Sequence, residues 1–226
     1  MAIDKARTSP AMKAGVIILI AAFVLGIAVI GIGGLTSGGG GSAPSQQTSD
    51  QTAAALRQIG QSAMASITPA EDALKAKPND YDLLKALGDQ YYDYAQRIGQ
   101  IAPGAGLDVT IWRQAVGYYE RALAVKPGDP SVGTDMAIAQ FYSGDTSAAV
   151  ATAEKVRKSS PSFAPAAFNS GVFYQSSGEN AKAIAAFQEY LRLEPNGPSA
   201  SSAKQLLSQL QSGGGQPQGS TAATGR

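Results

Sequence analysis

The chain contains neither cysteine nor histidine among its 226 residues. Without cysteine it has no thiol nucleophile, no disulfide and no lipoprotein anchor. Without either residue it has no Cys/His zinc site, no Ser-His-Asp triad and no haem attached through C-x-x-C-H. These absences remove a large part of enzyme chemistry, and they leave the redox compartment open.

The net charge is also close to zero, because the chain has 18 basic and 17 acidic residues. A general nucleic-acid binder would show a basic stripe, so the composition argues against one. The sequence has no G-x-S-x-G motif and no phosphate-binding loop. Catalysis would have to use carboxylates, tyrosine, lysine or serine alone, and the acids are scattered over predicted helix surfaces and caps. We therefore expect no enzyme, no cofactor and no metal.

One long apolar run stands near the amino terminus. Residues 14–35 carry no polar or charged side chain. As a helix they would reach about 33 Å, which is enough for a hydrocarbon core of about 30 Å. The run therefore predicts a single transmembrane helix that acts as an uncleaved signal anchor. A cleaved signal peptide is the alternative, although Pro44 would hinder cleavage near "GSAPS".

The basic residues around this run set the expected topology. Lys5, Arg7 and Lys13 precede it, and the next basic residue is Arg57. By the positive-inside rule, residues 1–13 are expected in the cytoplasm and the rest of the chain on the extracytoplasmic side. The Gly/Ser-rich stretch 36–47 is predicted to be a tether with an end-to-end distance of about 19 Å. The similar stretch 212–226 is predicted to be a disordered tail.

Three prolines recur at a fixed interval between these ends. Pro127, Pro161 and Pro195 are each 34 residues apart. A proline stops a helix because it lacks the N–H group and its ring clashes with the preceding turn. A regular stop therefore indicates a regular structural unit, and a period of this length is typical of repeat architectures.

The unit that ends at Pro195 is predicted to be a helix–turn–helix. Its first helix places small or apolar residues on one face, at Ala167, Ser170, Gly171 and Tyr174. Gly178 then breaks the pattern as a natural left-handed stop. A second helix follows, with Ala183, Phe187 and Tyr190 on one side.

The same features recur in the two preceding units. Ala137, Gly144 and Ala149 each lie 34 residues before Gly171, Gly178 and Ala183. The earlier unit reads L-G-x-x-Y at Leu87, Gly88 and Tyr91, and then Ala115, Tyr119, Ala122 and Pro127. These residues resemble the tetratricopeptide repeat pattern W-x-x-L-G-x-x-Y, A-x-x-x-F, P, with Leu84 in place of the tryptophan. The resemblance covers roughly residues 78–197, and it implies an all-α solenoid of helix–turn–helix repeats at 78–129, 130–163 and 164–197.

Two regions depart from the pattern. The first repeat is longer by fifteen residues, which we place in the turn around "QRIGQIAPGAGLDVT", with Asp108 capping the second helix. Residues 48–77 are interpreted as degenerate amino-terminal helices, the second of which begins with Thr68 as cap, Pro69 and a capping-box Glu71. Residues 198–211 are predicted to be a carboxy-terminal capping helix, which such stacks require.

The resemblance also implies a binding surface. In tetratricopeptide proteins, each first helix packs one face against the core, and its other face lines a concave groove for peptides. Projected onto this sequence, that face carries Lys85, Asp89, Tyr92, Asp93, Thr134, Asp135, Ile138, Phe141, Tyr142, Phe168, Asn169, Val172 and Gln175. Aromatic residues with a polar tip are good anchors, and the acids would suit a basic segment. The alternative is that the aromatic side chains pack against neighbouring helices.

These features lead to two hypotheses of function. The first is a membrane-tethered bacterial tetratricopeptide adaptor that binds a protein or peptide partner in an extracytoplasmic assembly. Such a protein would lie in the bacterial cell (inner) membrane as a single-pass protein. The second is a passive spacer, or a structural component that forms homo-oligomers through exposed repeat ends.

Overall fold

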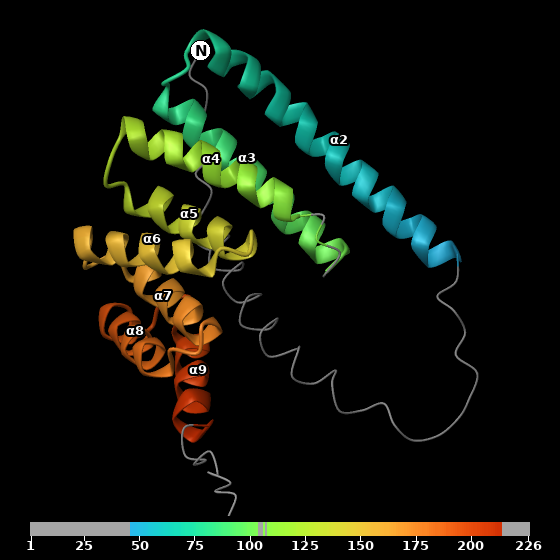
Figure 1. Ribbon diagram of the computed structural model, residues 1–226. Coiled ribbons are helices and arrows are strands. Elements are labelled where there is room, and N and C mark those ends of the chain that lie inside the picture. Colours follow the sequence, from blue (N-terminus) through green and yellow to red (C-terminus); the bar gives the residue numbers. More distant parts are fainter. Residues whose placement is uncertain (1–45, 104–105, 107, 214–226) are drawn as a thin grey trace, which may run out of the picture.

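The computed structural model describes residues 46–103, 106 and 108–213, and these residues form eight helices and no strand (Figure 1). The helices are α2 (Gln46–Ala76), α3 (Tyr81–Ile101), α4 (Val109–Val125), α5 (Pro130–Tyr142), α6 (Thr146–Ser159), α7 (Ala164–Ser176), α8 (Asn180–Leu193) and α9 (Ala200–Gly213). The all-α class expected from the sequence is confirmed for these residues.

The helices stack as three consecutive pairs, α3 with α4, α5 with α6, and α7 with α8. Each pair packs against the next, while α2 lies against α3 at one end and α9 against α8 at the other (Figure 1). A single apolar core runs through the stack, because each pair buries a face that it could not bury alone. Ala137, Ala149 and Ala183, which mark the period in the sequence, are all fully buried.

Close approach of the two helices within a pair depends on small residues in the first helix. A Cβ atom on Gly88 would lie 2.5 Å from the Tyr119 ring, and one on Gly171 would lie 2.5 Å from Phe187. Any side chain at either glycine would therefore collide with the second helix of its own repeat. The glycines at these positions therefore let the two helices of a repeat lie close together.

Turns and caps follow the residue types in the sequence. Gly144 and Gly178 have φ angles of 92° and 77°, so both adopt the left-handed conformation that glycine tolerates best. Asp129 caps α5 by accepting hydrogen bonds from the N–H groups of Ser131 and Val132. Asp108 differs from the expectation, because its carboxylate makes no cap bond and instead accepts a hydrogen bond from Trp112 Nε1 at 3.2 Å.

The fifteen extra residues of the first repeat lie mostly in helices, so placing them in the turn was wrong. Helix α3 has 21 residues where α5 and α7 have 13, and α4 has 17 where α6 and α8 have 14. The lengthened helices are held by buried side chains, since Ala95, Ile98 and Trp112 are almost inaccessible to solvent. The first pair therefore extends beyond the second one (Figure 1).

Helix α2 is one continuous helix through Pro69, so the two helices expected here were wrong. Proline inside a helix costs about 3 kcal/mol, because a hydrogen bond is lost and the ring crowds the preceding turn. A buried stripe continues on both sides of the proline, at Ile59, Ala63, Ile67 and Leu74. Packing of this stripe against α3 keeps the helix continuous across Pro69.

The predicted membrane span 14–35, residues 36–45 of the predicted tether and residues 214–226 of the predicted tail lie outside the described residues. The tether and tail were predicted two residues too long, because residues 46–47 belong to α2 and residues 212–213 to α9. Among the helices that the structure does describe, none is both long enough and apolar enough to cross a bilayer. Helix α9 begins at Ala200 and ends at Gly213, close to the expected capping helix.

Candidate interaction surface

The thirteen residues projected onto the groove-lining face of the first helices divide into two groups according to their burial. Seven of them are buried, namely Tyr92, Thr134, Asp135, Ile138, Phe168, Asn169 and Val172. The other six are at least partly accessible, namely Lys85, Asp89, Asp93, Phe141, Tyr142 and Gln175. We call these six accessible residues the candidate surface. Whether they bind a peptide stays a prediction.

A continuous row of aromatic rings supports this surface. The edge of Tyr92 meets the Trp112 ring at a centroid distance of 4.8 Å, and Trp112 stacks on Tyr142 at 4.9 Å. Phe141 follows at 5.6 Å from Tyr142 and stacks on Phe173 at 5.0 Å. Ring pairs at these separations each add about 0.5–1.5 kcal/mol beyond the area that they bury. The row therefore fixes the two accessible rings, Phe141 and Tyr142, on a rigid support.

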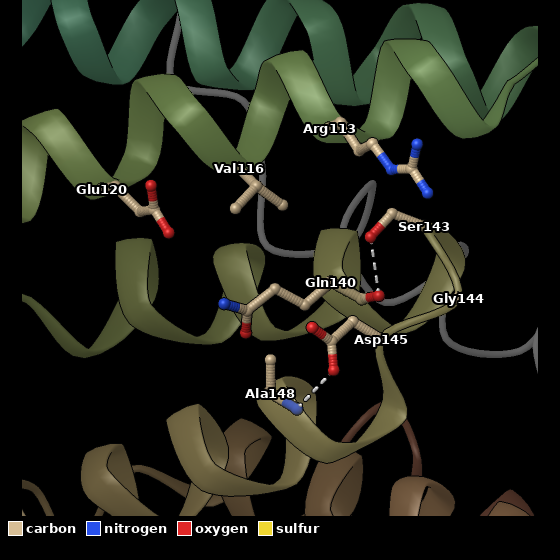
Figure 2. A pocket seen from close by; sticks show the side chains of 8 residues that line it. All are labelled: Arg113, Val116, Glu120, Gln140, Ser143, Gly144, Asp145 and Ala148. Atoms are coloured by element: carbon tan, nitrogen blue, oxygen red, sulfur yellow. Dashed lines mark hydrogen bonds between the residues drawn. The ribbon is translucent and has the colours of Figure 1, made fainter.

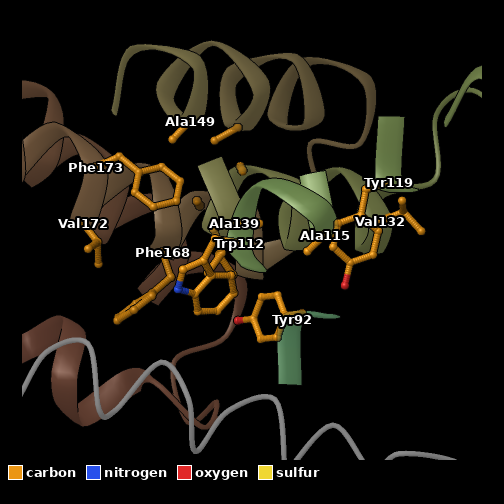
Figure 3. Packing of buried hydrophobic residues seen from close by; sticks show 14 of the residues in the cluster. Tyr92, Trp112, Ala115, Tyr119, Val132, Ala139, Ala149, Phe168, Val172 and Phe173 are labelled. Carbon is orange, nitrogen blue, oxygen red and sulfur yellow. The ribbon is translucent and has the colours of Figure 1, made fainter. Parts of the chain in front are cut away.

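Phe168 lies in the core rather than on the surface. It is fully buried, and its ring meets Phe187 at 5.6 Å and Tyr190 at 5.3 Å, both edge-on. Both partners belong to α8, the second helix of the same repeat, and Figure 3 shows Phe168 among the other buried residues. The alternative reading, core packing, therefore holds for Phe168, and this ring is not available as an anchor in this conformation.

The three aspartates on this face differ in their exposure to solvent and in their contacts. Asp89 is engaged on both oxygens, since Lys85 Nζ lies 2.5 Å from Oδ2 and the Tyr119 hydroxyl donates to Oδ1 at 2.9 Å. Asp93, one helical turn further along α3, is exposed. Asp135 is buried. The acidic rim inferred from the sequence is thus carried at the surface chiefly by Asp93, with Asp89 partly neutralised by Lys85.

Burial raises the pKa of Tyr92 and of Tyr119 well above its usual range, and the nearby carboxylate of Asp135 raises both further. Burial, and to a smaller extent the nearby carboxylate of Asp108, also raises the pKa of Tyr142 above its usual range. All three phenols are therefore neutral at any physiological pH. The three phenols therefore add no charge, and the negative charge of this face comes from the aspartates.

The sequence reasoning missed two residues of the aromatic row. Trp112 stands at the start of α4, in the lengthened part of the first pair, and Phe173 lies on the side of α7 that faces α5. Trp112 is the only tryptophan of the chain, which was an available signal. Its stacking on Tyr142 crosses from the first repeat to the second, so a period within single repeats could not reveal this contact.

A further link was missed on the other side of α3. Glu71 of α2 accepts hydrogen bonds from the hydroxyls of Tyr91 and Tyr118, each at 2.8 Å, and the two rings stack at a centroid distance of 5.4 Å. The capping role expected for Glu71 is wrong, because α2 does not begin there. The carboxylate instead ties α2 to both helices of the first pair.

Comparison with known families agrees with this architecture. The model of the tetratricopeptide repeat family matches residues 134–198, which include most of α5 to α8. The matched residues therefore carry the tetratricopeptide repeat pattern. Tetratricopeptide folds are generally scaffolds for protein–protein interaction. No curated protein matches the sequence.

Two crystal structures of MamA show the same fold. A crystal structure of MamA superposes with a TM-score of 0.58 at 20% identity, covering 70% of this chain and 82% of that chain. A second MamA crystal structure gives 0.57 at 19% identity, covering 75% of this chain and 84% of that chain. The first tetratricopeptide domain of Spaghetti (RPAP3), bound to the HSP90 peptide SRMEEVD, gives 0.49 at 18% identity, covering 59% of this chain and 91% of that one.

Proposed function

We propose that this protein is a membrane-tethered adaptor whose tetratricopeptide stack binds a protein or peptide partner through the candidate surface. The observation that carries the proposal is the aromatic row, in which the partly accessible rings of Phe141 and Tyr142 are held between the buried rings of Trp112 and Phe173. Rings held by neighbours lose little side-chain freedom on binding, which is what makes rigid aromatic residues effective anchors.

The proposed partner carries an apolar or aromatic side chain next to a basic one. The apolar group would cover Phe141 and Tyr142, while Asp93 would attract the cation. The cation would meet the exposed carboxylate of Asp93 and, one turn away on α3, the Asp89 carboxylate that pairs with Lys85 at 2.5 Å. An exposed pair of this kind is worth about 0.2–1 kcal/mol, so the rings supply most of the affinity and the charge supplies preference.

The proposed location follows from residues 1–47 of the sequence. The apolar run 14–35 would anchor the chain in the bacterial cell membrane, with residues 1–13 in the cytoplasm and the helical stack on the extracytoplasmic side. The tether would hold the stack about 2 nm from the bilayer, which raises its effective concentration for membrane-bound partners. The adaptor would take part in the assembly of a membrane or exported protein complex.

The experiment is affinity purification of the full chain from solubilised membranes, in the wild type and in a Phe141→Ala, Asp93→Lys variant. The adaptor predicts foreign proteins that are recovered with the wild type and lost with the variant. Lys204→Gln on the exposed side of α9 is the matched control and should recover every partner. Self-association alone, in both wild type and variant, would favour the spacer or homo-oligomer instead.

A further inference from the structure

The aromatic row under the candidate surface depends on Trp112, which belongs to the lengthened part of the first repeat. The 34-residue period makes Trp112 equivalent to Thr146 and Asn180, the first residues of α6 and α8. Helix α4 begins earlier, at Val109, so Trp112 already lies inside its first turn. The extra residues at the start of α4 therefore support a ring at a position where the other two repeats have a polar residue.

A hydrogen bond at the start of α4 orients this indole. Trp112 Nε1 donates to Asp108 Oδ2 at 3.2 Å, and only 2% of Trp112 is exposed to solvent. A buried N–H group without an acceptor is unfavourable, so the carboxylate favours the orientation in which Nε1 points towards it. In that orientation the ring stacks on Tyr142 at an interplanar angle of 17° and lies edge-on to Tyr92 at 90° (Figure 3).

The position of Asp108 is itself fixed by its surroundings. Its carboxylate lies close to α3, because a Cβ atom on Gly99 would be only 3.2 Å from Asp108 Oδ2. The carboxylate forms no cap bond with α4, which leaves it available to the indole. Burial, and to a smaller extent the charge of Asp108, raises the pKa of Tyr142, so the carboxylate also lies near this phenol. Asp108 is thus placed where α3, Trp112 and Tyr142 meet.

We propose that Asp108 is a positioning residue of the candidate surface. It sets the orientation of Trp112, and Trp112 in turn holds the partly accessible Tyr142 ring where a partner meets it. Asp108 acts through the indole and does not itself contact the partner. The link to a partner rests on the proposed function, whereas the orientation of Trp112 by Asp108 can be measured without one.

Tryptophan fluorescence of the full chain in detergent micelles tests the first step, because Trp112 is the only tryptophan. Asp108→Ala removes the acceptor, so Nε1 must turn to water. The emission should then move to longer wavelength, and quenching by acrylamide should rise at least about twofold. Asp108→Asn removes the same charge but keeps an acceptor oxygen, so it should restore the wild-type spectrum. An unchanged spectrum in Asp108→Ala, or equal spectra of the two variants, would overturn the assignment.

Glu120→Gln is the matched control, since it removes a negative charge from the same helix. Glu120 lies eight residues beyond Trp112, about 12 Å along α4. Together with Arg113 and Val116 it lines an open hollow between α4, α5 and α6, and no ring of the aromatic row lines this hollow (Figure 2). The variant should leave the emission and the quenching of Trp112 unchanged. A change as large as that of Asp108→Ala would show a general response to charge on α4 and contradict the specific role of Asp108.

Cross-linking in intact cells tests the second step, with a photoreactive amino acid at Gln175 of the full chain. Adducts with a foreign protein should fall at least about threefold in Asp108→Ala, because the Tyr142 ring is no longer held for binding, and should return in Asp108→Asn. Equal adducts in wild type and Asp108→Ala would contradict the positioning role even if the fluorescence changes. Absence of adducts in the wild type would contradict the proposed function instead, while the fluorescence still decides whether Asp108 orients Trp112.

Discussion

Phe187 occupies the space into which any side chain at Gly171 would project, since a Cβ there would lie 2.5 Å from the ring. We therefore expect Gly171→Ala to destabilise the last repeat, because either the fully buried ring or the two helices must move. Overpacking of this kind costs about 1–3 kcal/mol. Urea or thermal unfolding of the full chain measures the change.

Gly117 is the matched control for this substitution. It also lies inside a helix, α4, but a Cβ there would meet nothing within 4 Å. Gly117→Ala should therefore stabilise the fold by about 0.5–1 kcal/mol, as expected for alanine in place of glycine in an open helix position. Equal effects of the two substitutions would contradict the close approach at Gly171.

The Glu71 carboxylate gives a second prediction, on the attachment of α2. Glu71→Ala removes the acceptor of both the Tyr91 and the Tyr118 hydroxyl, so it should destabilise the α2 contact by more than either Tyr→Phe change alone. Hydrogen bonds to a charged group contribute about 1.5–3 kcal/mol each. Faster hydrogen exchange confined to α2 would report the local loosening.

Asp72 provides the control, because it is the neighbouring acid and pairs only with Lys75 on the exposed side of α2. Asp72→Ala should leave exchange in α2 nearly unchanged, since exposed pairs contribute about 0–1 kcal/mol. If Asp72→Ala loosens α2 as much as Glu71→Ala does, the two tyrosine hydrogen bonds are not what holds the helix.

Asp129 predicts a pH-dependent loss of stability. Burial alone would raise the pKa of this carboxyl, but hydrogen bonds from the Tyr81 hydroxyl and from the Val132 and Ser131 N–H groups outweigh it, and the pKa is lowered. A lowered pKa means that the ionised form stabilises the fold above the unfolded value of about 3.8. This contribution is lost as the pH falls through the lower folded pKa.

The measurement compares wild type with Asp129→Asn in urea at a series of pH values. Asparagine can still cap α5 through its one oxygen, but an uncharged NH2 group replaces the second oxygen, which accepts the 2.6 Å hydrogen bond from Tyr81. The wild type should be more stable than the variant near neutral pH, and the difference should shrink below about pH 4. A difference that stays constant over that range would show that charge at Asp129 does not matter.

Phe141 and Phe168, the two phenylalanines that the sequence placed on the groove-lining face, should differ in how much they contribute to stability. Phe168 is fully buried against α8, so Phe168→Ala should cost about 3–5 kcal/mol and unfold much of the last repeat. Phe141 is only partly buried, so Phe141→Ala should cost clearly less while weakening partner binding. Circular dichroism and melting curves separate the two. A folded Phe168→Ala variant with normal stability would contradict the core assignment.

The proposed topology predicts that the helical stack is accessible from outside the inner membrane. Protease added to spheroplasts should degrade the stack, because the basic residues precede the apolar run 14–35. A cytoplasmic protein in the same preparation is the control for intact membranes. A stack that survives under conditions where an extracytoplasmic marker is degraded would reverse the proposed topology.

The repeat architecture could be predicted from the sequence because its determinants are local and recur. Gly144 and Gly178 fix the turns through their own φ angles, and Gly171 fixes the helix approach through its lack of a side chain. These properties belong to single residues, so a period of 34 residues was enough to find them. Extra residues in the first repeat had no such marker, and they were placed in the turn although they mostly extend α3 and α4.

The candidate surface was harder to predict because burial depends on distant partners. Phe168 is buried because Phe187 and Tyr190 meet its ring, whereas the preceding repeat has Ala153 and Val156 at those two positions. Likewise Tyr142 is held by Trp112 of another repeat. A sequence pattern within one repeat predicts the helix face on which a residue lies, but not the size of the side chains that pack against that residue.

The central claim is that a partner contacts the face carrying Phe141 and Tyr142, and site-specific photo-cross-linking in intact cells tests it most directly. A photoreactive amino acid at Tyr142 or Gln175 should yield a covalent adduct with a foreign protein. The same probe at Lys155, on the exposed side of a second helix, should not. Adducts at Lys155 but none at Tyr142 and Gln175, or adducts only with a second copy of the chain, would contradict the account.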